Sequence, residues 1–347
     1  MPSDFKIIKG PYIRDILQQP EALRKTLEGL GRDQLQGLDG NAARFDRIVL
    51  TGMGSSFHAL YPLHLQLLSA GLPSLHVETA ELVHYQMGAM NKNTLLVAVS
   101  QSGRSIEIVR LLELSKDRRS RLLGVTNDET SPLAVQSEGL VMMRAGEEVS
   151  VSCKTYLATL LALEWLGAVL VGGDADETRA VLGEAATATE NYLRKWESHV
   201  EAFARSLEGV GQVFVVGRGR SLATAETGGL ILKESTHVPA EGMSSAAFRH
   251  GPFETLSDHI FVLVMEGDSV TAALNRRLVE DIRAAGGRAA LVSASDSNQE
   301  CRLLDSREAM RPILEMLPVQ MLSLALAALR VREAGRFGLL QKVTTVE

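Results

Sequence analysis

The chain has 347 residues, of which 45% are hydrophobic and 22% charged, a composition that excludes a disordered protein and is typical of a folded globular one. Because single hydrophobic cores stop growing at about 300 residues, we expect two domains or an internal duplication. The formal charge of −6 gives no general attraction to nucleic acid or to an anionic membrane surface, so an anionic ligand must be held locally.

The N-terminal residues MPSDFKIIKG contain no apolar signal core. Two cysteines, Cys153 and Cys301, are too few for a disulfide framework, and we therefore expect a cytoplasmic protein. A polar, amphipathic helical arm is predicted over residues 12–30, with a break near Pro20.

Four short runs rich in β-branched and other apolar residues follow, and helical patterns separate them. The predicted strands are RIVLTG (47–52), SLHVETA (74–80), TLLVAVS (94–100) and RLLGVTN (121–127), and the helical patterns between them cover 57–71, 81–88 and 105–116. Such alternation predicts a parallel sheet with helices on both faces.

The most apolar stretch, residues 156–173, carries Glu164 and Trp165 in its middle. Its unbroken apolar runs are too short for a membrane span, so we interpret it as a helix buried in a core or at a subunit interface. The polar helical stretch over 174–207 is the predicted connector between two halves.

The second half begins as the first does, because QVFVVGRGRS (212–221) again joins an apolar strand to glycines and a serine. Gly217 lies 165 residues after Gly52. Two more strands, HIFVLVME and RAALVSAS, and a closing helix over 310–335 complete this half. The sequence thus predicts an α/β protein of two similar units. The predicted boundaries are 1–35 for the arm, 36–172 for the first domain, 173–207 for the connector, 208–334 for the second domain and 335–347 for a tail.

The loop after the third predicted strand is rich in hydrogen-bond donors. At the carboxyl ends of parallel strands, helix N-termini offer free N–H groups and a positive dipole end. Ser100, Ser102 and Ser105 add hydroxyls there and Gln101 adds an amide, which makes a neutral cradle for one phosphate. The alternative is a hydroxyl-rich N-cap that only terminates the helix. Three hydroxyls and an amide within six residues favour the phosphate site.

Nucleotide and metal sites fit the sequence less well. No G-x-x-x-x-G-K segment is present, which excludes the usual nucleoside triphosphate loop. Phe57 and Leu222 stand where the third glycine of a dinucleotide fingerprint would fall, although Glu78 would suit a ribose contact. His58 and His84 lack metal-ligand spacing, and we predict neither a metal nor a cofactor.

A second informative passage runs from residue 226 to residue 254. Glu234 lies in the last turns of a predicted helix, where it could act as a general base or, equally, be a solvated glutamate paired with a lysine. His250 is followed by glycine and proline, so we expect a loop that presents the imidazole.

Seven short segments in this order resemble the sugar isomerase (SIS) family, in particular the isomerase half of glucosamine-6-phosphate synthase. They are TGMGSSFHA, SQSGRSIE, VSCKTY, GRGRS, LKE, FRHGP and the terminal KVTTVE. The likeness begins at the helical arm, so we expect no glutaminase domain and no built-in ammonia source.

The resemblance implies two flavodoxin-like SIS domains in a homodimer that binds a sugar phosphate in the first domain. It assigns Glu234 to proton transfer between C1 and C2, and Lys342 to an imine with the open ketose. It assigns His250, contributed by the neighbouring subunit, to ring opening. The residues assigned to the phosphate and the substrate are Ser55, Ser56, Ser100, Gln101, Ser102, Ser105 and Ser152.

The sequence departs from the synthase pattern at several positions. Ile231 and Thr227 replace a lysine and a glutamate, and Met53 replaces a cysteine. Exchanging charged for neutral groups changes both sugar contacts and pKa tuning. VSCKTY is one residue shorter than the family's loop, which leaves the roles of Ser152 and Lys154 open.

We therefore expect an enzyme that opens the ring of a hexose or amino-sugar 6-phosphate and shifts a proton between C1 and C2. It would then release an amine, as a glucosamine-6-phosphate deaminase or a fructosamine-6-phosphate deglycase does, or act as a simple aldose–ketose isomerase; the same residues serve both. A non-catalytic phosphosugar sensor is the alternative from another class. The presence of Glu234, His250 and Lys342 together favours an enzyme.

Overall fold

The computed structural model describes residues 3–38, 42–295, 298–339 and 342–344. The chain divides into two compact units, each with its own sheet. The first-sheet unit consists of Glu21–Glu147, Lys154–Glu184 and Leu339–Glu347. The second-sheet unit consists of Met1–Pro20, Glu148–Cys153 and Ala185–Gly338.

The first-sheet unit contains a parallel sheet of five strands in the order β2-β1-β3-β4-β5, which is the flavodoxin-like order. The strands are β1 (Arg47–Gly52), β2 (Ser74–Glu78), β3 (Thr94–Val99), β4 (Arg121–Thr126) and β5 (Gly139–Met142). Every residue of β3 is buried, as expected for a central strand covered on both faces.

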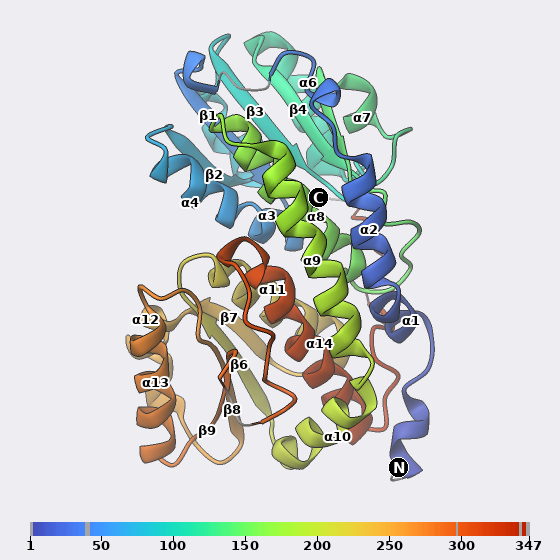
Figure 1. The fold of residues 1–347 in the computed structure, drawn as a ribbon, viewed down its shortest axis with the longest axis vertical. Helices are drawn as coiled ribbons and strands as arrows, with labels where there is room; N and C mark the ends of the chain where they lie inside the picture. The colour runs from blue at the N-terminus through green and yellow to red at the C-terminus, as the bar shows by residue number, and fades with distance from the viewer. Residues whose placement is uncertain (1–2, 39–41, 296–297, 340–341, 345–347) are drawn as a thin grey trace. The chain divides into compact units, whose positions relative to one another are not determined.

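Helices cover this sheet (Figure 1). They are α3 (Ser55–Ala59), α4 (Tyr61–Ser69), α5 (Thr79–Glu81), α6 (Ile106–Arg118), α7 (Pro132–Gln136) and α8 (Lys154–Leu170), together with most of α2 (Gln19–Gly29). On one face, Ile108 and Leu111 of α6 pack in a cluster with Val49 and Leu96 of the strands. All residues of α8 are buried, which confirms the interpretation of the apolar stretch as a buried helix.

The second-sheet unit contains a parallel sheet of four strands in the order β7-β6-β8-β9. The strands are β6 (Gln212–Gly217), β7 (Ala240–Ser244), β8 (Ile260–Met265) and β9 (Arg288–Val292). The helices are α1 (Pro11–Leu17), the end of α9 (Ala175–Leu193), α10 (Trp196–Leu207), α11 (Ser221–Thr236), α12 (Ser245–Arg249), α13 (Ala272–Ala284) and α14 (Arg311–Leu329).

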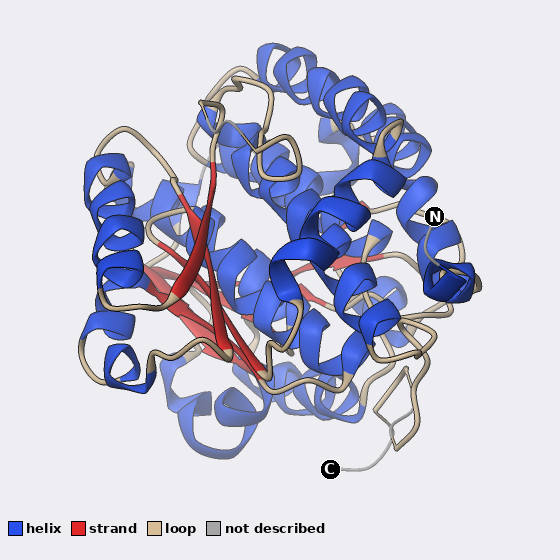
Figure 2. Cartoon of the chain, turned by 90° about the horizontal axis from the view of Figure 1, so that it is seen from below, coloured by secondary structure: helices blue, strands red, loops and turns tan. Residues whose placement is uncertain are grey.

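The strands of each unit lie between layers of helices, as Figure 2 shows by colour. In the second-sheet unit, Leu278 and Ile282 of α13 and Phe248 of α12 pack against Val216 and Val262 of the strands. Helices α11 and α14 pack against one another, and α11 also contacts β6 and β7. The predicted fold class, an α/β chain with two helix-covered parallel sheets, is therefore confirmed.

Three sequence predictions need correction. Residues 139–142 form β5, although no strand is predicted there. Residues 240–244 form β7, although no strand is predicted there, because AEGMS contains no β-branched residue and the strand pairs only with β6. The predicted helical stretch 174–207 is two helices, α9 and α10, which are separated at Arg194 and Lys195.

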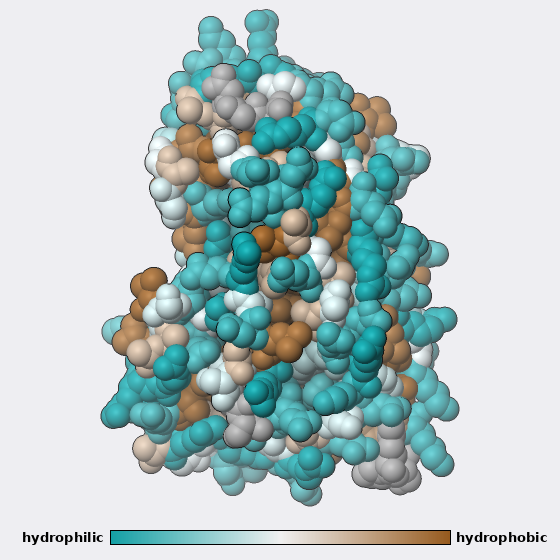
Figure 3. Space-filling model, in the orientation of Figure 1, coloured by the Kyte–Doolittle hydropathy of each residue, from teal (hydrophilic) through white to brown (hydrophobic). Residues whose placement is uncertain are grey.

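The segment Glu308–Leu329, which includes α14, is long and apolar enough to cross a membrane. However, 94% of its most apolar window is buried inside the protein, which is the position of a core helix. The face of the molecule in Figure 3 is mainly hydrophilic, with smaller apolar areas between the polar side chains. A scattered distribution of this kind is ordinary for a protein surface.

Candidate active site

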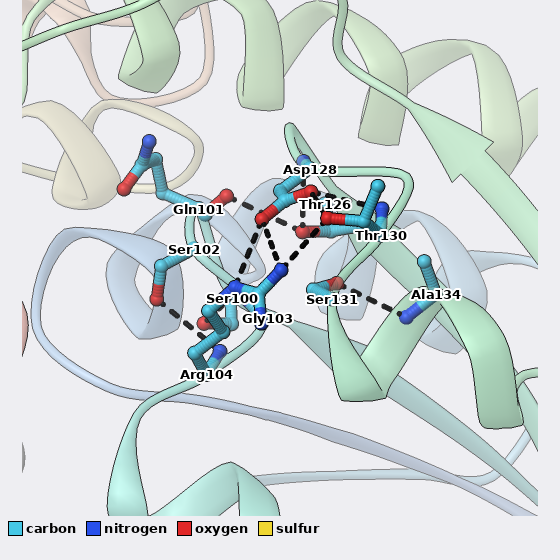
Figure 4. Close-up of polar contacts among 10 residues, drawn as sticks. All are labelled: Ser100, Gln101, Ser102, Gly103, Arg104, Thr126, Asp128, Thr130, Ser131 and Ala134. Atoms are coloured by element: carbon cyan, nitrogen blue, oxygen red, sulfur yellow. Dashed lines mark hydrogen bonds and ion pairs between the residues drawn. The ribbon is translucent and has the colours of Figure 1, made fainter.

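The loop between β3 and α6 forms a compact turn at the carboxyl end of the first sheet. Ser100 continues β3, because its N–H donates to the carbonyl of Val125 over 3.0 Å. Its hydroxyl then accepts from the N–H of Gly103 over 3.1 Å. The Gln101 side chain extends away from these contacts (Figure 4). The turn is thus held by Ser100, and the Gln101 amide is left for another partner.

Ser105 occupies the N-cap of α6, but its hydroxyl makes no capping hydrogen bond. An N-cap serine normally accepts from an N–H of the first helical turn. The N–H of Ile106, the first residue of α6, donates to the carbonyl of Thr344 over 3.3 Å. The C-terminal tail, two residues after Lys342, therefore reaches the start of α6. The hydroxyl of Ser105 does not serve the helix, which weakens the simple N-cap interpretation of this loop.

Ser55 and Ser56 follow β1 at the same edge of the sheet, in the first turn of α3. Both are half-buried. Within the part of the chain that the structure describes, their hydroxyls and that of Ser105 make no hydrogen bond to protein. A phosphate oxygen is an acceptor that such hydroxyls can satisfy. The edge of the first sheet thus offers several neutral donors that are not needed for its own folding.

The loop is braced on its exposed side by Arg104. Its guanidinium pairs with the Asp128 carboxylate over 2.9 Å and donates to the Thr130 hydroxyl over 2.8 Å (Figure 4). Hydrogen bonds from the Thr130 hydroxyl, the Thr130 N–H and Arg104 lower the pKa of Asp128. Asp128 is therefore ionised at neutral pH, and its charge is balanced by the only basic residue of the 100–105 loop. No sequence signal indicated these contacts, because Asp128 and Thr130 lie 24 and 26 residues after Arg104.

Two glycines are required by the close packing of these turns. Gly103 has φ +60°, and a Cβ at this position would lie 2.6 Å from the Cβ of Ser131. A Cβ at Gly52 would lie 3.0 Å from the carbonyl oxygen of Val99 and from the N–H nitrogen of Phe57. The sequence patterns G-M-G-S-S and S-Q-S-G therefore have a steric cause as well as a chemical one.

In the second-sheet unit, Glu234 lies in the last turn of α11 and is half-buried. Its neighbour is Tyr12 of α1, whose pKa is raised by burial and further by the nearby Cys153, Glu234 and Glu148. Tyr12 is fully buried and hydrogen-bonds the Ser323 hydroxyl over 3.1 Å. Tyr12 therefore remains a neutral phenol within the electrostatic influence of Glu234, which no sequence signal in the helical arm could have indicated.

Three other predicted residues have different settings. His250 is the C-cap of α12 and is exposed, and Gly251 follows it with φ +144°. Ser152 is half-buried and belongs to the second-sheet unit, so the first-sheet unit does not bring it together with the 100–105 loop. Lys342 is half-buried and belongs to the first-sheet unit, as that loop does.

In the described residues, no group of three or more His, Cys, Asp or Glu side chains could hold a metal ion. The first-sheet edge can instead bind an anion through hydroxyl, amide and helix N-terminal donors. The half-buried Glu234 is a candidate for proton transfer.

Comparison with known proteins agrees with this picture, because residues 43–168 match the family model described as "SIS domain". These residues resemble a SIS domain. They contain β1 to β5 and the serine loop.

A glutamine–fructose-6-phosphate aminotransferase (isomerizing) from Thermococcus kodakarensis is 29% identical over 96% of this chain and 58% of its own length. The chain thus spans a little over half the length of that relative. Among solved structures, the C-terminal domain of the glucosamine-fructose-6-phosphate aminotransferase from Francisella tularensis has a TM-score of 0.83 at 20% identity, over 93% of this chain and 96% of its own. A glucosamine-6-phosphate deaminase from Thermotoga maritima has a TM-score of 0.81 at 18% identity, over 97% and 100%. The predicted resemblance to the isomerase half is confirmed.

Proposed function

We propose that the protein is an enzyme that opens the ring of an amino-sugar or hexose 6-phosphate, moves a proton between C1 and C2, and releases the amine where one is present. The observation that carries the proposal is the set of hydroxyls at the edge of the first sheet that have no protein partner in the described chain. The similarity to a glutamine–fructose-6-phosphate aminotransferase, of which this chain covers 58% of the length, supports the substrate class.

The proposed phosphate site uses the hydroxyls of Ser55, Ser56 and Ser105 with the amide of Gln101. Ser100 and Ser102 support it less directly, because their hydroxyls accept from backbone N–H groups of the same loop. The site carries no positive side chain of its own, since Arg104 pairs with Asp128. Affinity would therefore come from several hydrogen bonds and from the dipole of α6.

In the proposed reaction, the imidazole of His250, supplied by the second subunit of a homodimer, moves a proton to the ring oxygen and opens the ring. The Glu234 carboxylate then removes the proton from C2 of the open amino sugar and returns it to C1. Water adds to the resulting C2 imine, and ammonia leaves as fructose 6-phosphate forms. Lys342 would hold the open ketose through an imine whose formation releases one water. Without an amine, the same proton shift interconverts an aldose and a ketose.

The decisive assay incubates the purified protein with glucosamine 6-phosphate and measures ammonia and fructose 6-phosphate together. We expect both products in equal amounts. Glu234→Gln should lower kcat by at least about a hundredfold, because it removes the proton acceptor and keeps the side chain's size. Glu241→Gln is the control, since Glu241 is an exposed carboxylate of the same unit.

Other outcomes separate the alternatives. Interconversion of fructose and glucose 6-phosphates without ammonia would replace the deaminase by a simple isomerase. Binding of phosphosugars without turnover of any of them would contradict the proposed enzymatic function and favour a non-catalytic phosphosugar sensor. Near-normal turnover of Glu234→Gln would remove Glu234 from the mechanism.

A further inference from the structure

A cavity of about 480 Å³ lies in the second-sheet unit, and its described lining includes none of the candidate active-site residues. It is bounded by the end of α9, the start of α10, the segment 299–304 and α14. This volume is within the range of about 300–1,000 Å³ that is typical of small-molecule sites. Neither the proposed reaction nor the similarity to known proteins gives this cavity a role.

The floor and one wall of the cavity are apolar. Leu314 and Leu317 of α14 line it and are buried, and Leu304 lines it with 55% of its surface exposed. The rings of Tyr192 and His199 stack with their centroids 4.2 Å apart and their planes 18° from parallel. The Tyr192 hydroxyl donates to the Glu300 carbonyl over 2.5 Å, which fixes this pair. The cavity therefore presents a hydrocarbon floor beside a rigid aromatic wall.

The charged groups of the cavity are all positive. Arg194, Lys195 and Arg302 line it, and no carboxylate is among the described lining residues. Arg194 has an exposed partner, Glu190, at 3.3 Å, which leaves Lys195 and Arg302 as the cations with no carboxylate of their own in the described chain. Burial lowers the pKa of His199, so this ring is neutral at pH 7. The chain as a whole has a net charge of −6, so a cavity lined by three cations and no described carboxylate is locally positive in an acidic protein.

The start of α10 adds to the positive potential. Lys195 is the N-cap of this twelve-residue helix, and His199 in its first turn lines the cavity. The positive end of the helix dipole therefore lies on the same side as the cationic side chains. Charge and dipole act together on any anion that enters.

We propose that this cavity binds a small organic phosphate that carries a flat, largely apolar ring, with the size of a mononucleotide. The ring would cover the leucine floor beside the Tyr192–His199 pair, and the phosphate would pair with Lys195 and Arg302. A sugar phosphate lacks an apolar face of this kind, so the ligand differs from the substrate proposed above. The inference does not depend on the reaction, because it concerns binding alone.

The test is isothermal titration calorimetry on the full chain with 5′-AMP and phenyl phosphate, against adenosine and inorganic phosphate. We expect at least one ring-bearing phosphate to bind at least about tenfold more tightly than adenosine or inorganic phosphate alone, because ring and charge contribute together. Lys195→Gln and Arg302→Gln should each weaken that binding by about tenfold, which is the size of one lost charge-assisted contact.

Arg205→Gln is the matched control, since Arg205 is an exposed cation of α10 outside the lining. Its affinity for the probes should equal that of the unmodified protein. The proposal is overturned if neither ring-bearing phosphate binds more tightly than inorganic phosphate. It is overturned equally if Arg205→Gln weakens binding as much as Arg302→Gln does, because the attraction would then be general and not local.

Discussion

After β1 the chain turns at Gly52 and continues into α3, and after β6 it turns at Gly217 and continues into α11. A side chain at either glycine would meet the backbone that follows, at 3.0 Å from the Phe57 nitrogen and at 2.9 Å from the Ser221 carbonyl oxygen. The two sheets therefore share the same kind of tight glycine turn between strand and helix. The side chains at the two sheet edges, however, differ.

The loops after β3 and β8 differ in chemistry. After β3, the loop carries serines and Gln101, whereas after β8 it carries Glu266 and Asp268. Glu266 pairs with Arg276 over 2.6 Å, and Asp268 accepts from the N–H groups of Val270 and Thr271 over 3.1 and 3.2 Å. The Glu266 and Asp268 carboxylates of this loop thus have partners within the protein.

A third carboxylate, that of Glu315, also lies at the edge of the second sheet. Glu315 of α14 is fully buried and accepts from the Ser221 hydroxyl over 2.8 Å. Burial raises its pKa to about 8, against the hydrogen bond from Ser221 and the charge of Arg311, which lower it. Two sheets with similar backbone turns thus differ in their side chains. The edge of the first sheet carries neutral hydroxyl donors, and the edge of the second sheet carries carboxylates of the protein itself. Fold alone does not decide which edge binds a ligand.

Gly103→Ala should impair both stability and binding. The new Cβ would lie 2.6 Å from that of Ser131 at a φ of +60°, so the loop must shift. We expect a loss of about 1–3 kcal/mol in the free energy of unfolding and a more than about tenfold loss of glucosamine 6-phosphate binding. Urea unfolding and calorimetric titration measure the two quantities.

Gly267→Ala is the counterpart at the second sheet. Gly267 has φ +75°, but its nearest contact would be the Ser221 hydroxyl at an ordinary 3.4 Å. The variant should lose about 1 kcal/mol of stability and keep its affinity for the phosphosugar. If both variants lose affinity equally, the assignment of the phosphate to the first sheet is wrong.

Glu315→Gln should reveal the buried acid of the second sheet through pH. Between the ordinary pKa near 4.5 and about 8, the folded state keeps a proton that the unfolded state releases. Stability from this group therefore falls as pH rises across that interval, by up to about 1.4 kcal/mol per unit, and levels off above pH 8. The variant should be nearly as stable as the parent at pH 5 and more stable at pH 8.

Thermal unfolding midpoints at pH 5, 6, 7 and 8 measure this difference. Glu308→Gln, which removes the same charge from an exposed site just before α14, is the matched control. A difference that stays constant from pH 5 to pH 8, or that grows equally for Glu308→Gln, would contradict the buried-acid explanation.

The sequence predicted most of the strands because short, nearly continuous apolar runs, which are typical of buried parallel strands, make up β1, β3, β6 and β8. It could not predict β7, whose residues have no strand preference and are extended only because β6 is beside them. The serine loop was found from its composition. The uses of its serines were not, since the hydrogen bond from Ile106 to Thr344 depends on how the distant tail folds back.

The smallest expected effect on stability is that of Ser105→Ala, and it separates a cap from a binding group. Ser244 caps α12 through a 3.0 Å hydrogen bond from the Ala247 N–H, whereas Ser105 makes no such bond at α6. Ser244→Ala should therefore lose about 1 kcal/mol of stability, and Ser105→Ala less than about 0.5 kcal/mol. For binding of glucosamine 6-phosphate the order should reverse, with about a tenfold loss for Ser105→Ala only. Equal stability losses would mean that Ser105 is a structural cap. The hydroxyls of the first sheet would then no longer support the proposed phosphate site.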